Sequence, residues 1–72
     1  MSADMRPSEL RALMEAEARR QRDDLRARGE TPEPSIVAAL VIESFQKLPS
    51  VSGRLELLWR YVEDYVRDLD AP

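Results

Sequence analysis

Residues 36–48 read IVAALVIESFQKL, and this stretch decides the fold. On a helix its large apolar side chains form two stripes, with one residue outside both: Val37, Val41, Phe45 and Leu48; Ile36 and Leu40; and Ile42. A helix that is apolar on most sides must be surrounded, and one neighbouring helix cannot cover three directions. The β-branched residues also fit a buried strand. A lone strand would have no partner elsewhere in the chain, so we predict a helix.

Local signals on either side predict two more helices. Ser8 can cap a first helix, and Gly29 suits the left-handed position after its end. Thr31 can cap a second helix that has Pro32 in its first turn, and Pro49 stops that helix. The predicted all-α fold has three helices, at about 8–28, 32–48 and 51–69, in one domain over residues 8–70 that follows a disordered leader, residues 1–7.

The predicted third helix carries one long apolar stripe, which we interpret as its core face: Val51, Leu55, Leu58, Trp59, Val62, Tyr65, Val66 and Leu69. Leu57 and Tyr61 fall on the opposite side, one turn apart. This pair is either a contact surface or two of the scattered apolar residues that every protein surface carries.

The first helix has too few apolar residues to cover the second by itself. Its candidate stripe of Leu10, Leu13, Met14, Ala18 and Leu25 is interrupted by Glu17, Gln21 and Arg22. The second helix must then meet another chain. We therefore expect a long charged first helix, a hairpin of the second and third helices, and a two-fold homodimeric bundle formed through that hairpin.

Charges in the first helix are separated by sign. Residues 8–18 hold three Glu and one Arg, whereas residues 19–28 hold five Arg and two Asp. This order complements the helix dipole, and it also suits two copies that pair antiparallel. At the end of the third helix, Asp64, Asp68 and Asp70 oppose the dipole. The Arg-rich half of a first helix, from the same or a neighbouring chain, can compensate them, or they are simply hydrated.

Residue types argue against catalysis. The 72 residues include no cysteine and no histidine, so thiolate nucleophiles, soft metal sites and the usual general base near neutral pH are excluded. Gly29 and Gly53 do not form a phosphate-binding loop. Glu56 and Glu63 share a face, but each lies within reach of an arginine, Arg60 or Arg67, which explains them as surface pairs. We predict no enzyme activity, no metal and no cofactor.

The best functional interpretation is a small cytoplasmic interaction protein, an adaptor or regulator that docks a helix face on a larger protein and associates with itself. No membrane-spanning or export segment is evident. The predicted interface residues are the anchors Phe45, Leu57, Trp59, Tyr61 and Tyr65 and a steering edge of Arg19, Arg20, Arg22 and Arg26. The alternative is DNA or RNA binding through these arginines, which the net charge of −3 disfavours.

Overall fold

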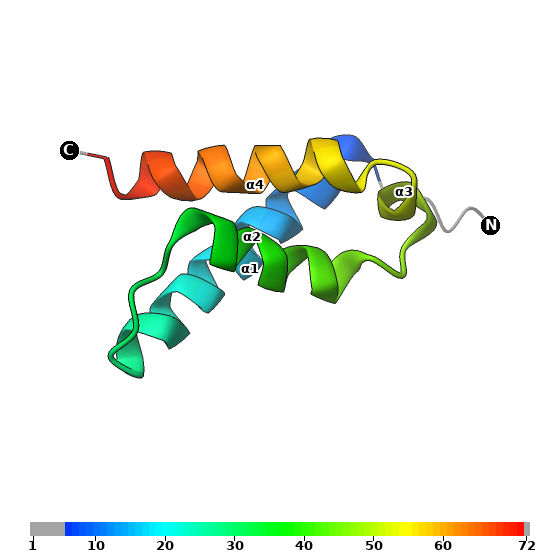
Figure 1. The fold of residues 1–72 in the computed structure, drawn as a ribbon. Coiled ribbons are helices and arrows are strands. Elements are labelled where there is room, and N and C mark those ends of the chain that lie inside the picture. Colours follow the sequence, from blue (N-terminus) through cyan, green and yellow to red (C-terminus); the bar gives the residue numbers. More distant parts are fainter. Residues whose placement is uncertain (1–5, 72) are drawn as a thin grey trace.

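The structure, a computed structural model, describes residues 6–71 and consists of helices (Figure 1). Three long helices and one short helix follow one another: α1 (Pro7–Ala27), α2 (Pro34–Phe45), α3 (Pro49–Ser52) and α4 (Leu55–Leu69). No strand occurs between residues 6 and 71, so the predicted all-α class is confirmed. Of the predicted leader, residues 1–5 lie outside the described residues, and Pro7 already belongs to α1.

Prolines, rather than hydroxyl caps, begin three of the helices. Pro7, Pro34 and Pro49 each occupy the first helical position, and none of these helix starts has a side-chain cap hydrogen bond. Proline suits this position because its ring presets φ and the missing N–H would have no partner there. The predicted caps at Ser8 and Thr31 are therefore wrong, and α2 begins at Pro34 instead of Pro32.

Two predictions about helix ends meet different outcomes. Gly29 has φ +78° and ends α1 as predicted; its N–H bonds to the Arg26 carbonyl, and the N–H of Glu30 bonds to the Leu25 carbonyl at 2.8 Å. The predicted end of the second helix at residue 48 is wrong, because α2 stops at Phe45.

The predicted third helix, 51–69, is divided in two. Pro49 starts the single turn of α3, Gly53 ends it, and α4 begins only at Leu55. Val51 therefore lies in α3, where it is fully buried. The apolar stripe of the predicted helix is thus assembled from two elements.

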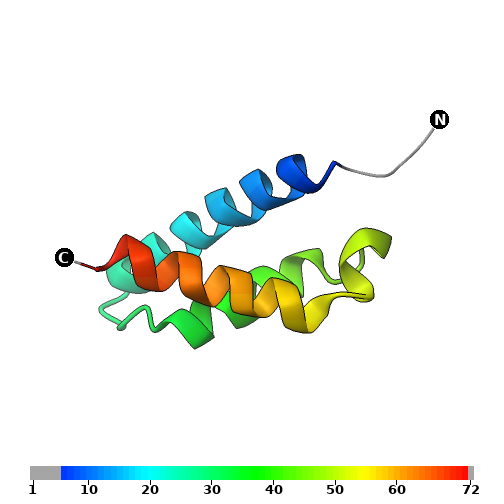
Figure 2. The same cartoon turned by 90° about the horizontal axis from the view of Figure 1, so that it is seen from above.

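The three long helices alternate in direction along the chain. The α2 and α4 helices form an antiparallel hairpin joined through α3, and α1 crosses obliquely over one face of this hairpin, contacting both of its helices (Figures 1 and 2). As a result α1 and α4 point in the same direction. This arrangement leaves α1 on only one of the two hairpin faces.

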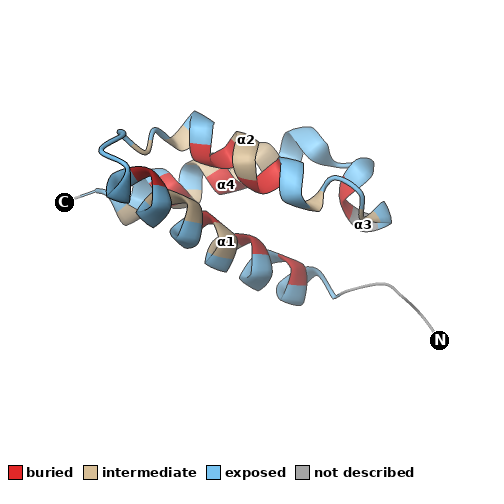
Figure 3. Cartoon of the chain, turned by 90° about the horizontal axis from the view of Figure 1, so that it is seen from below, coloured by how far each residue is buried: buried red, intermediate tan, exposed pale blue. Residues whose placement is uncertain are grey.

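The core lies between α1 and the hairpin (Figure 3). It is built from these buried residues: Leu10, Met14, Ala18 and Leu25 of α1; Val37, Ala38, Val41 and Ile42 of α2; Val51 of α3; Val62 and Val66 of α4. No charged or polar residue is buried in the described part of the chain.

The expectation that α2 needs a second chain to cover it is wrong. Two helices of the same chain cover most of it, and even Ile42, which lies outside both stripes, is only 6% exposed. The apolar stripe of α1 suffices because its buried residues fall one or two turns apart on one side, while Leu13 stays outside at 47% exposure. Ile36, at 42%, is the large apolar residue of α2 that remains exposed.

Candidate protein-binding surface

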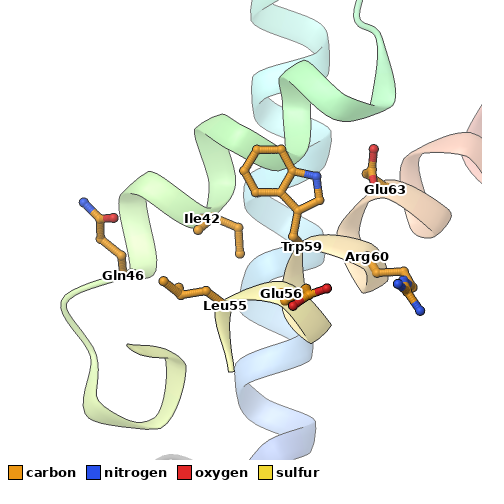
Figure 4. Close-up of a pocket in the computed structure, with 7 residues that line it drawn as sticks. All are labelled: Ile42, Gln46, Leu55, Glu56, Trp59, Arg60 and Glu63. Atoms are coloured by element: carbon orange, nitrogen blue, oxygen red, sulfur yellow. The ribbon is translucent and has the colours of Figure 1, made fainter. Parts of the chain in front are cut away.

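A groove of about 580 Å³ runs between the end of α2 and the start of α4. Its apolar walls are Ile42, Leu55 and Trp59, and its rim is polar. Figure 4 shows the Trp59 ring beside α2, with Leu55 and Ile42 toward one end and Glu63 toward the other. The complete lining is Ile42, Gln46, Leu55, Glu56, Trp59, Arg60 and Glu63.

This groove opens on the hairpin face opposite α1. Two residues after Trp59, and two residues after Glu63, the chain has a tyrosine that bonds to α1. Two residues turn a helix by about 200°, so Trp59 and Glu63 lie on the side of α4 that faces away from α1. Figure 4 accordingly shows α1, the pale blue helix, behind the hairpin. The α1 helix covers one face, and the face with Trp59 is left bare.

Charges on the rim of the groove have no partner within the described chain. Glu56, Arg60 and Glu63 form no ion pair among residues 6–71. The predicted surface pairs with Arg60 and Arg67 are therefore not formed; Arg67 instead bonds to Asp64 at 3.0 Å. The three side chains thus remain available to charges on another molecule.

The other side of α4 is joined to α1 by polar contacts. The Tyr61 hydroxyl donates a hydrogen bond to the Glu15 carboxylate, and Arg19 donates one to the Tyr65 hydroxyl. Tyr61 also packs against the core. The predicted exposed pair of Leu57 and Tyr61 is therefore wrong in one member, because α1 covers Tyr61 and only Leu57, at 66%, is exposed.

Burial and the bond to Glu15 change the acidity of Tyr61. Loss of water raises the pKa of its hydroxyl to about 12, because it disfavours the phenolate, and the hydrogen bond to the Glu15 carboxylate acts in the same direction. The tyrosine therefore stays a hydrogen-bond donor over the physiological pH range. Its hydroxyl is bound to α1 and is not presented to a partner.

The end of α4 is compensated within the same chain. Arg22 and Arg26 reach the carboxylate of Asp70 at 3.2 and 2.9 Å. Of the two alternatives left open for the acidic helix end, compensation by the Arg-rich half of α1 is found at Asp70, within the same chain. Asp64 is paired with Arg67 on its own helix.

The predicted steering edge is engaged in contacts within the chain. Arg20 bonds to Glu17 and lies 3.8 Å from Asp24, and Arg28 lies 3.7 Å from Glu30. The hydrogen bond from Arg20 lowers the pKa of Glu17. With Arg19, Arg22 and Arg26 also bonded, the basic half of α1 is a mixed-sign surface rather than the open basic patch that binds phosphates.

The structure separates the other predicted anchors. Phe45, Trp59 and Tyr65 all pack against the core, and Trp59 also lines the groove, whereas Leu57 is exposed on the surface. Leu55 and Ile42 were not predicted as interface residues. The available signal for this face was Ile42, the one residue of α2 outside both apolar stripes.

A second hollow, of about 500 Å³, lies between the connector before α2 and the end of α4. Arg26, Arg67 and Asp70 contribute to its lining, so basic and acidic groups meet there. Across residues 6–71, no group of three or more carboxylates is placed to hold a metal ion. Nor does any helix in that range combine the length and apolarity required to cross a bilayer.

Comparison with known proteins adds no family: no protein-family model, curated protein sequence or solved structure matches this chain.

Proposed function

We propose that this chain is a non-catalytic cytoplasmic interaction protein, an adaptor or regulator that docks the bare face of its α2–α4 hairpin on a helix of another polypeptide. The observation that supports this is the position of Trp59. The chain's single tryptophan lies in a groove on the face that α1 leaves uncovered.

The chemistry of this face suits a helical partner. The groove has the composition of a protein interface: its apolar walls, Ile42, Leu55 and Trp59, lie between charged rim residues and include an aromatic anchor. The groove lies along two antiparallel helices, so a third helix can lie in it and present residues one turn apart. Nucleic-acid binding receives no comparable support, because the arginines predicted for it, Arg19, Arg20, Arg22 and Arg26, are bonded within the chain.

Two exposed leucines of α4 provide a matched test. Leu55 lines the groove and is 36% exposed, whereas Leu57 lies outside it and is 66% exposed. We expect Leu55→Glu to abolish the capture of binding proteins from the source cells, because it places a charge against the apolar walls. Leu57→Glu should capture the same proteins as the wild type.

Quantitative mass spectrometry of proteins captured by the three forms measures this difference. Equal loss with both variants, or no loss with Leu55→Glu, would contradict the proposal. Circular dichroism of each variant checks that the helix content is unchanged.

A further inference from the structure

Four charged residues of α4 alternate in sign along one row. Glu56, Arg60, Glu63 and Arg67 are spaced by four, three and four residues, which places them on one side of the helix. The first three line the groove. Arg67, which is bonded to Asp64 and lines the second hollow, continues the row toward the end of α4. The row therefore follows the edge of the bare face.

This row is complementary to itself when it is reversed. When a second copy of the row is placed antiparallel to the first, each acidic residue faces a basic residue of the other copy. We infer that the bare face binds a second copy of this chain, with α4 antiparallel to α4 of the copy and the two-fold axis between Tyr61 and Val62. This inference rests on the proposed function and names its partner.

The axis follows from the residue numbers. In this register Glu56 faces Arg67 of the second copy and Arg60 faces Glu63 of the second copy, and symmetry repeats both pairs. A parallel arrangement would place Glu against Glu and Arg against Arg. Charge complementarity thus selects one direction and one register, as it does along the edges of coiled coils.

The same register brings the apolar walls of the two grooves together. Trp59 lies opposite position 64 of the second copy, so the two indole rings are five residues apart along the axis, about 7.5 Å at 1.5 Å per residue. Ile42 lines the groove beside each ring. The dimer would therefore bury the apolar walls at its centre and leave the charged row at its edge, the usual arrangement of an interface.

Charge reversal tests the inference with paired variants. Glu56→Arg with Glu63→Arg makes the row entirely basic, and Arg60→Glu with Arg67→Glu makes it entirely acidic. We expect each double variant alone to self-associate at least about tenfold more weakly than the wild type, because four attractive contacts become repulsive. An equimolar mixture of the two should form a heterodimer as strong as the wild-type dimer.

Sedimentation equilibrium of the wild type, of each variant and of the mixture measures these affinities, with circular dichroism as the folding control. A wild type that stays monomeric overturns the inference, as does self-association of either variant at wild-type strength or a mixture that does not associate. If a reversed variant loses its helix content, Glu56→Gln with Glu63→Gln replaces it and should still weaken the dimer. If monomeric wild type captures other proteins in a Leu55-dependent way, the second copy is refuted and the proposed function stands.

Discussion

Tyr61 and Tyr65 join α4 to α1 by hydrogen bonds. A tyrosine hydroxyl both donates and accepts hydrogen bonds. Tyr61 donates to Glu15 in the acidic half of α1, and Tyr65 accepts from Arg19 in the basic half. Asp70 continues the series with Arg22 and Arg26. The separation of charge along α1 therefore matches the order of polar groups along α4 when the two helices run in the same direction.

The raised pKa of Tyr61 predicts a late titration. In a Tyr65→Phe variant, Tyr61 is the only tyrosine, and its phenolate absorbance should appear with a midpoint of about 12. Adding Glu15→Gln should lower the midpoint part of the way toward the ordinary value of about 10, because burial remains. Spectrophotometric titration of the two variants, with circular dichroism to show that they stay folded, measures the shift.

The sign of the linked stability change follows from the same pKa. Because the folded-state pKa lies above the unfolded one, the contribution of Tyr61 is complete below about pH 10 and is lost as the pH rises toward about 12. Replacing Tyr61 with Phe should remove this loss. A midpoint near 10 in folded Tyr65→Phe protein would refute the contact with α1.

Residue-scale predictions from the sequence succeeded where the cause is local. Gly29 was correctly placed in the left-handed region because that conformation is intrinsically open to glycine. Tyr61 was wrongly placed on the surface because its cover comes from α1, more than forty residues earlier in the sequence. The spacing of apolar residues within α4 does not show which of its sides another helix covers.

At the scale of elements, α1 is the helix that completes the core. Its residues Leu10, Met14 and Ala18 are buried one turn apart and cover the side of the hairpin that bears Val62 and Val66. Helix rather than strand was predictable for the three long helices, because it depends on local composition and periodicity. The helix bounds were harder to predict. Pro32 and Pro34 are nearly equal candidates for the first residue of α2, and the sequence alone does not choose between them.

Two neighbouring residues of α1 test its role in the core. Met14 is 0% exposed and Leu13 is 47% exposed. We expect Met14→Ala to lower the free energy of unfolding by about 2 to 5 kcal/mol, because it leaves a cavity between α1 and the hairpin. Leu13→Ala should lower it by less than about 1 kcal/mol.

Urea unfolding followed by circular dichroism measures both changes. Similar values for the two variants would mean that α1 does not pack through the Met14 side. Loss of cooperative unfolding in Met14→Ala alone would agree with the expected direction, since a chain of this length has only a few kcal/mol of stability.

At the scale of the whole molecule, two layers account for both the core and the bare face. The hairpin has two sides, and α1 covers one of them (Figure 2). An excess of apolar surface on α2 was recognisable in the sequence, and it was first interpreted as a need for a second chain. Most of that surface is covered internally: Ile36, outside the groove, stays exposed at 42%, and Ile42, which lines the groove beside Trp59, is only 6% exposed. The location of the groove depends on where α1 lies, and the sequence pattern does not determine this.

The most direct test of the bare face as the site of self-association is the accessibility of Trp59 as the protein concentration is raised. Its fluorescence reports on the groove alone, because it is the only tryptophan. Acrylamide quenching of the wild type should fall over the same concentration range in which the sedimenting mass doubles, and Leu55→Glu should show neither change. Quenching that stays constant while the mass doubles, or a mass that never rises, would contradict the account.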